Sequence, residues 1–227
     1  MKIRKSIVFY AFCLVLLNIS NKVNAQIIKG EAILGANISQ VDGDEVYGFK
    51  KLGAHIGFGG LIPIGIFDAS MEVLFNQKGS REKQQYVFDT LTGEYNLRLN
   101  YVEIPIMLYI NDKDNASAGI GFSYARLVGV KEFEHGWQTS TTIYNDVYSR
   151  SDWSILFDLK LKILEGLKAN LRYEYSLVPI RTREFTQLWG TTDVTVRQQY
   201  NNLWTFRLIY IFNEKQSRDN VELNKKR

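Results

Sequence analysis

Apolar and polar residues alternate with a period of two along most of the chain. The clearest stretch runs from 153 to 163, where apolar residues hold the odd positions and Ser154, Asp158 and Lys160 hold even ones. This period is that of a β-strand with one apolar face, and helical spacing matches poorly. The pattern predicts eight strands, at residues 31–39, 51–58, 70–76, 101–110, 119–124, 153–163, 167–177 and 204–212.

Short and long connections alternate between these segments. The short ones are 62–65, 111–115 and 164–166, and the others are 41–47, 80–96, 131–152 and 178–201. An up-and-down antiparallel sheet with its long loops at one end produces this order, which is typical of outer-membrane barrels. We therefore expect an all-β fold: an eight-stranded, antiparallel, up-and-down transmembrane β-barrel.

Side-chain size indicates which face of the strands points inward. An eight-stranded barrel has just enough interior for side chains to fill it. The apolar face would overfill it, because it carries Phe58, Phe75, Phe122, Trp153, Phe157, Tyr173, Tyr175, Trp204, Phe206, Tyr210 and Phe212, whereas the other face is rich in glycine and serine. An outward apolar face with aromatic residues at both ends of the strands requires lipid. The alternative is a secreted soluble barrel with its apolar face inward.

The first 25 residues have the pattern of a cleaved secretory signal peptide. Three basic residues precede an apolar run at 7–17, and Val23-Asn24-Ala25 resembles a cleavage site. The apolar run is about half of the ~20 residues that a spanning helix needs. We expect the signal peptide at 1–25, the barrel domain at 26–212 and a charged periplasmic tail at 213–227.

The net positive charge and the single cysteine both belong to the predicted signal peptide. The chain has 28 basic and 24 acidic residues, and the excess is accounted for by Lys2, Arg4, Lys5 and Lys22. The single cysteine, Cys13, also lies in this segment. The remainder is neutral and free of cysteine, which excludes a disulfide scaffold and removes the argument for nucleic acid as a partner.

Several stretches resemble the PorT-like outer-membrane β-barrel family. They are residues 35–39, 53–57, 72–79, 99–106, 172–177 and 208–212, of which the third and fourth are the most specific. The resemblance implies an integral barrel of the bacterial outer membrane. It implies no defined activity, because most relatives have none.

The inward face of the predicted barrel collects charge near mid-height. The residues concerned are Glu72, Glu103, Asp158, Lys160, Arg172, Glu174 and Arg207. Unpaired charges in a narrow lumen are costly, so we expect them to pair with one another and fill the barrel. The alternative is a constriction that selects ions or small solutes in a narrow channel.

The least favoured hypothesis is that the protein is an outer-membrane lipid-modifying enzyme. His55 and His135 are the only histidines, and His55 is expected to point into the lumen, away from a lipid substrate. The loop that holds His135 lacks a G-x-S-x-G elbow or a spaced triad. We predict no catalytic residue, no cofactor and no metal site.

The long loops are the remaining candidates for function. They carry aromatic residues among polar ones: Tyr86, Phe88, Trp137, Tyr144, Tyr148, Phe185 and Trp189. Such residues suit a binding surface, although long loops also pack on one another. The sequence predicts a monomer in outer-membrane lipid with a structural or interaction role, such as adhesion or attachment to an envelope assembly. Its partners would be extracellular ligands or envelope proteins.

Overall fold

Eight long strands form the body of the protein. The computed structural model describes residues 28–64, 66–84, 86–87, 90–91, 93–112, 115–186 and 194–213. The long strands are β1 (Lys29–Asp42), β2 (Lys51–Ile64), β3 (Phe67–Lys78), β7 (Tyr95–Asp112), β8 (Ala116–Glu134), β10 (Ser151–Leu164), β11 (Leu167–Ser176) and β13 (Val194–Ile211). Each predicted segment falls on one of them. The predicted signal peptide and all but the first residue of the predicted tail lie outside the described residues.

The strands pair in an antiparallel ring. Each pairs with the next in the order β1, β2, β3, β7, β8, β10, β11 and β13. The ring is completed by β1, which pairs with β13 as well as with β2, so that Ala32 lies opposite both Phe58 and Tyr210. The predicted all-β antiparallel arrangement of eight strands is confirmed.

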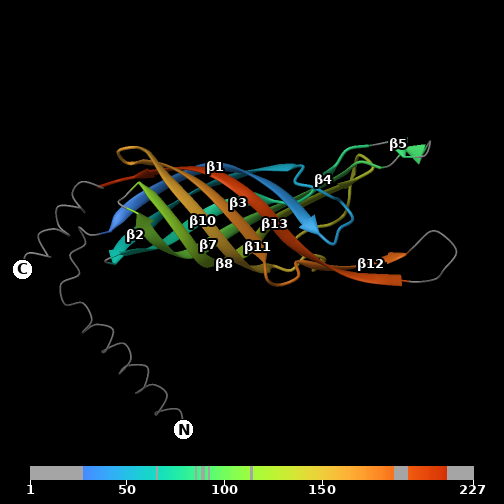
Figure 1. Cartoon of the computed structure of the whole chain (residues 1–227). Helices are drawn as coiled ribbons and strands as arrows, with labels where there is room; N and C mark the ends of the chain where they lie inside the picture. The colour runs from blue at the N-terminus through green and yellow to red at the C-terminus, as the bar shows by residue number, and fades with distance from the viewer. Residues whose placement is uncertain are drawn as a thin grey trace, which may run out of the picture.

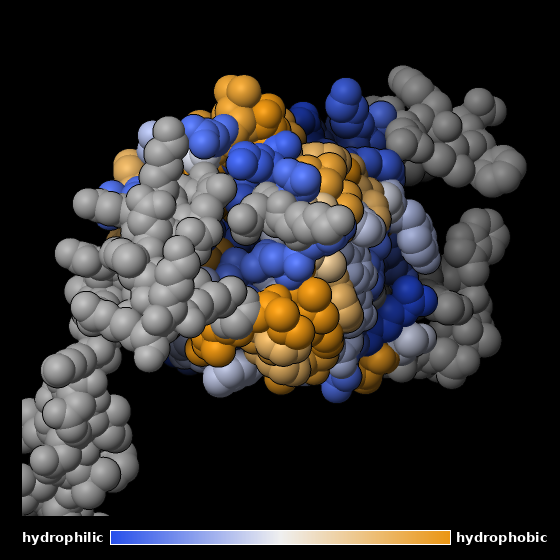
Figure 2. Space-filling model, turned by 60° about the vertical axis from the view of Figure 1, so that its left-hand side comes forward, coloured by the Kyte–Doolittle hydropathy of each residue, from blue (hydrophilic) through white to orange (hydrophobic). Residues whose placement is uncertain are grey.

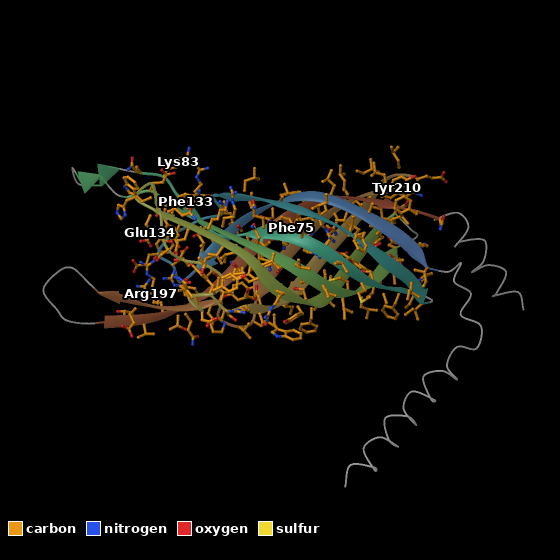
Figure 3. All side chains as sticks on the ribbon, turned by 180° about the vertical axis from the view of Figure 1, so that it is seen from behind. Phe75, Lys83, Phe133, Glu134, Arg197 and Tyr210 are labelled. Carbon is orange, nitrogen blue, oxygen red and sulfur yellow. The ribbon has the colours of Figure 1, made fainter. Side chains whose placement is uncertain are left out.

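The two ends of the ring differ. The first described residues of β1 and the last of β13 lie at one end, which we call the turn end (Figure 1). The long connections lie at the opposite, loop end. Three short strands extend the sheet there: β4 (Arg81–Glu82), β9 (Trp137–Gln138) and β12 (Arg181–Thr186). Two more, β5 (Tyr86–Val87) and β6 (Thr90–Leu91), form a separate two-stranded sheet. Figure 3 shows Tyr210 at the turn end, and Lys83, Glu134 and Arg197 at the loop end.

Three strands reach much further towards the loop end than the alternation predicts. Strands β7, β8 and β13 have 18, 19 and 18 residues, so parts of the predicted loops 80–96, 131–152 and 178–201 are strand. A register shift between Asn100 and Tyr101 interrupts the pairing of β7 with β8. Beyond it the sense of the alternation reverses on β7, where Leu97 and Leu99 are buried and Arg98 is exposed, and on β8 Lys131 is exposed and Glu132 buried. The predicted turn 62–65 is also wrong in part, because β2 continues to Ile64.

The apolar face of the strands points outward. Along β7 the exposed row is Val102, Ile104, Ile106, Leu108 and Ile110, and Phe58 and Phe206 are 66% and 61% exposed on other strands. Figure 2 shows hydrophobic surface on the side wall beside hydrophilic surface. We call these outward rows, taken together, the apolar belt. Among the described residues, no helix is long and apolar enough to cross a membrane.

Small residues on the inward face make room for large ones on the neighbouring strand. A Cβ atom at Gly121 would lie 2.4 Å from the Met107 sulfur, and one at Gly119 would lie 2.4 Å from the Tyr109 ring. Met107 and Tyr109 are fully buried in the lumen. The glycines predicted for a crowded inner wall therefore serve to admit these side chains.

Candidate functional site

Two networks of charged side chains cross the lumen, and the one nearer the turn end is centred on four of them. Arg172 makes two contacts with Asp158, Nε to Oδ1 at 2.7 Å and Nη2 to Oδ2 at 2.9 Å. It also makes two contacts with Glu72, from Nη1 at 3.2 Å and from Nη2 at 3.3 Å. Arg207 bonds the same two carboxylates, Glu72 at 2.7 Å and Asp158 at 2.9 Å. Two guanidinium groups and two carboxylates thus satisfy one another without an excess charge.

Further polar side chains complete this turn-side network. Tyr109 donates its hydroxyl hydrogen to Asp158 at 2.6 Å, and Arg207 Nε donates to the Asn170 amide oxygen at 2.6 Å. Lys160 lies over the Tyr109 ring, with Nζ 3.9 Å from its centre, and 3.3 Å from Glu31. Such partners offset the cost of removing charged groups from water.

A second network lies nearer the loop end and is organised around Lys78. Its ammonium group contacts Glu174, and lies 3.4 Å from both Glu103 and Asp152. All four side chains are fully buried. The Asn76 amide group donates to Glu103 at 2.9 Å. Three carboxylates therefore surround one lysine in this loop-side network.

All seven lumen charges predicted from the sequence are buried and lie in these two networks. Three partners escaped the sequence prediction: Glu31, Lys78 and Asp152. Strand parity is the signal for the last two, because Lys78 continues the inward row of Glu72, and Asp152 that of Asp158. The alternation fades at the strand ends, where both residues lie.

An apolar cluster closes the lumen above the loop-side network. It consists of Val41, Leu97, Leu99, Tyr101, Ala125, Leu127, Tyr148 and Ile180, and we call it the mouth cluster. Its Tyr148 and Ile180 come from the long connections and fold back into the end of the ring. The Tyr148 hydroxyl donates to Glu132 at 3.1 Å and accepts from Arg181 at 2.8 Å. Burial raises the pKa of Tyr148 well above its ordinary value.

The predicted loop aromatics therefore divide into two groups. Tyr148 is only 2% exposed, so its assignment as a binding residue is wrong. Trp137 and Tyr144 are 82% and 77% exposed and remain available to a partner. Tyr86 lies in β5 and Phe185 in β12. Phe88 and Trp189 lie outside the described residues.

The two histidines differ in burial and in position. His55 is fully buried on the inward face of β2, as predicted, and His135 is exposed beyond the end of β8. Within the described ranges, no three His, Cys, Asp or Glu residues are grouped so as to hold a metal ion.

An acidic cleft of about 350 Å³ opens at the loop end. It is lined by Asp44, Glu45, Val46, Glu82, Gly93, Glu94, Tyr95, Glu134, His135 and Arg183. Asp44 is 8% exposed and accepts a hydrogen bond from the Val46 amide at 2.8 Å. Burial raises the pKa of Asp44 from 3.8 to about 6.

The family can be assigned by comparison with known proteins. Residues 24–181, more than half of the chain, match the family model for the outer membrane protein beta-barrel domain. This chain belongs to that family. The outward belt and inward charges are what such a barrel requires, and membership places the protein in the bacterial outer membrane.

Solved structures of similar proteins share little sequence with this barrel. The Neisserial surface protein A is 10% identical, with 82% of this chain and 97% of that chain covered and a TM-score of 0.47. The attachment invasion locus protein Ail of Yersinia pestis is 12% identical, with 81% and 98% covered and a TM-score of 0.46. OprG of Pseudomonas aeruginosa is 10% identical, with 82% and 95% covered and a TM-score of 0.37. A comparison with curated proteins returned no match.

Proposed function

We propose that this protein is a transmembrane barrel with a filled lumen that acts through its loop end, as a binding or attachment protein of the outer membrane. The observation that carries the proposal is the length of its strands. A tilted strand crosses a bilayer with about 9–11 residues. Strands β7 and β8 have 18 and 19 residues, and the surplus lies at the loop end beyond the apolar belt. A barrel that served only as an anchor would not need this raised, ordered sheet.

The raised sheet is built to be rigid. Strand β12 pairs with β13 from Arg181 opposite Gln199 to Thr186 opposite Val194. The Tyr95 hydroxyl donates to Glu132 at 2.9 Å, and Arg181 contacts the same carboxylate at 3.0 Å. Exposed aromatic side chains on a rigid support lose little conformational entropy when they bind a partner. Trp137 of β9 is in this position, and exposed Tyr144 lies in the connection that follows β9.

The side chains that meet across the lumen favour a filled barrel over the alternative of a narrow channel. Strands β3 and β11 are separated by three strands in either direction around the ring, so the contact of Arg172 with Glu72 spans the full lumen. Lys78 and Glu174 span it again nearer the loop end. The mouth cluster covers both networks. Small barrels are normally packed in this manner.

A role without catalysis is part of the proposal. His55 has no contact with the surface, and His135 has no serine or cysteine nucleophile among the residues that line its cleft. We also expect that the protein binds no cofactor. The proposed partners are extracellular ligands or envelope proteins, the proposed surroundings are outer-membrane lipid, and the proposed state is a monomer that does not bind nucleic acid.

Two finer assignments belong to the same proposal. The stretches at 72–79 and 99–106 support a PorT-like branch of the family, and the pattern of residues 1–25 supports removal of a signal peptide on export. N-terminal sequencing of protein extracted from outer membranes tests the second assignment, with Gln26 as the expected first residue.

Site-specific photo-crosslinking in living cells tests the binding role. A photoreactive amino acid replaces Tyr144 or Trp137 at the loop end, and the matched control replaces Ile163, which lies in the apolar belt near the turn end. We expect discrete protein or glycan adducts from the two loop-end positions and lipid adducts from position 163. Lipid adducts alone from all three positions would contradict the binding role.

Planar-bilayer recordings separate binding from transport. The purified parent protein should give no discrete conductance steps, because side chains from opposite walls meet in the lumen. Stable, ion-selective steps that change size in a Glu72→Gln variant would favour the channel alternative.

A further inference from the structure

Two shallow apolar grooves lie on the outer wall of the barrel. The first, of about 510 Å³, is lined by Ile104, Ile106, Phe122, Ser123, Tyr124 and Trp153 of β7, β8 and β10. The second, of about 410 Å³, is lined by Phe157, Asp158, Leu159, Leu171, Tyr173 and Trp204 of β10, β11 and β13. Each contains one aromatic pair, Tyr124 with Trp153 and Tyr173 with Trp204, with ring centres 4.9 and 4.8 Å apart. The grooves are thus similar in size and lining.

A cation is fixed at the loop-side end of the first groove. Arg126 follows Tyr124 in the outward row of β8 and is exposed. Its Nη1 donates to the Ser151 hydroxyl at 3.1 Å, and the Tyr124 hydroxyl lies 3.1 Å from the same oxygen. Arg126 is the first charged residue of this outward row on the way to the loop end, beside the aromatic pair Tyr124 and Trp153. Aromatic residues mark the membrane interfaces of such barrels, where lipid headgroups lie.

Two more cations follow on the same wall. Arg98 of β7 and Lys131 of β8 lie directly opposite one another in register, and both side chains are exposed. Like charges at directly opposed positions destabilise a sheet. Within the part of the chain that the structure describes, neither has an acidic partner within ion-pair distance. An anion from outside the chain would relieve this repulsion.

A negatively charged side chain lies near the loop-side end of the second groove, where the first groove has a cation. Asp42 of β1 lies near its loop-side end, opposite Tyr200 in register. Its carboxylate accepts hydrogen bonds from Gln40 at 2.7 Å and from Asn202 at 3.1 Å. This wall therefore combines a similar apolar groove with a satisfied carboxylate, where the first wall has Arg126.

We propose that the wall formed by β7, β8 and β10 binds an anionic, phosphate-bearing lipid of the surrounding leaflet. The acyl chain occupies the groove beside Tyr124 and Trp153, and the phosphate contacts Arg126, with Arg98 and Lys131 above it. A guanidinium group binds phosphate with strong, charge-assisted hydrogen bonds. The apolar groove and the cations must be used together, which selects a lipid rather than a soluble anion. This site is separate from the loop-end binding surface and does not depend on it.

The two tryptophans provide matched reporters for this site. One version of the full chain retains only Trp153 and another only Trp204, with the other tryptophans changed to phenylalanine. Each is reconstituted in phosphatidylcholine vesicles that contain a small fraction of phosphatidic acid or phosphatidylcholine with brominated acyl chains, which quench tryptophan on contact. Basic residues near an anionic surface each favour binding by roughly fivefold. We expect brominated phosphatidic acid to be preferred by at least about fivefold at Trp153, and no preference at Trp204.

Charge variants decide the cause of that preference. Arg98→Gln, Arg126→Gln and Lys131→Gln combined should abolish the preference at Trp153. The control Arg197→Gln removes a loop-end cation on β13 that pairs with Glu45 and should leave it intact. Unchanged quenching by phosphatidylcholine shows that the barrel is still folded in every variant.

Three results would overturn the proposal. The first is equal quenching by the two lipids at Trp153. The second is a preference that survives the triple substitution. The third is loss of the preference in excess inorganic phosphate but not in chloride of equal ionic strength, which would mark a site for soluble anions instead of lipid.

Discussion

Arg172 of β11 and Glu72 of β3 form a two-point ion pair across the full width of the lumen. They are 100 positions apart in the chain, and the two contacts measure 3.2 and 3.3 Å. Their strands lie on opposite sides of the ring. Because Arg207 and Asp158 join the same pair, walls that share no backbone hydrogen bonds are fastened together through side chains.

Removing one carboxylate from this network should strongly destabilise the barrel. Glu72→Ala leaves Arg172 and Arg207 each with one partner fewer in a buried site. Loss of one member of a buried ion pair costs about 3–5 kcal/mol. Denaturant unfolding in lipid vesicles, followed by tryptophan fluorescence, measures the change. Glu82→Ala is the control, because its pair with Lys50 is partly exposed and should cost no more than about 1 kcal/mol.

A methyl group on the inner wall should be tolerated less well than one on the outer wall. In Gly121→Ala the new Cβ would lie 2.2 Å from the Ile106 carbonyl oxygen and 2.4 Å from the Met107 sulfur. Overpacking of this kind costs about 1–3 kcal/mol. The matched Gly60→Ala variant meets only Ile28 at 3.5 Å and should unfold like the parent. Equal stability of the two variants would mean that the inner wall can relax.

A charge placed in the apolar belt tests its contact with lipid. Leu208 lies in the middle of the outward row of β13 and is 49% exposed. Leu208→Arg should lower the free energy of unfolding in a bilayer by about 2–4 kcal/mol, because arginine would lie near the bilayer midplane. Tyr144→Arg, at an exposed loop position, should change it by less than about 0.5 kcal/mol. A similarly small effect for Leu208→Arg would mean that the outward row of β13 faces water and not lipid.

The acidic cleft should lose stability as the pH rises from about 4 to 6. Asp44 has an ordinary pKa of 3.8 and a folded-state pKa of about 6, raised chiefly by burial. Between these values the unfolded segment gives up its proton while the folded segment keeps it, so folding becomes less favourable; above pH 6 the full penalty applies. Hydrogen exchange of residues 43–50, corrected for intrinsic rates, measures this change. An Asp44→Asn variant should show no such dependence, and a parent with flat protection would contradict the assignment.

Sequence alone predicted much of the fold and part of the site. The eight strands, their outward apolar face and the seven lumen charges all follow from the period-two pattern. The residues missed, Lys78 and Asp152, share the parity of the predicted ones but lie where the pattern fades. The sequence does not predict the burial of Tyr148, because an aromatic residue in a loop looks the same in sequence whether it faces water or the mouth of a barrel.

The primary sequence determined which residues face lipid and which face the lumen, because lipid and lumen differ strongly in polarity and alternate residues of a strand meet one or the other. Only the tertiary structure decided how Arg172 finds Glu72, since that pairing depends on the register and tilt of eight strands together. It also decided that β7 and β8 continue past the belt, because there the sense of the alternation reverses: Leu97 and Leu99 point inward into the mouth cluster, and Arg98 between them points outward. The closure of the mouth by Tyr148 is likewise set by how the long connections fold back into the ring.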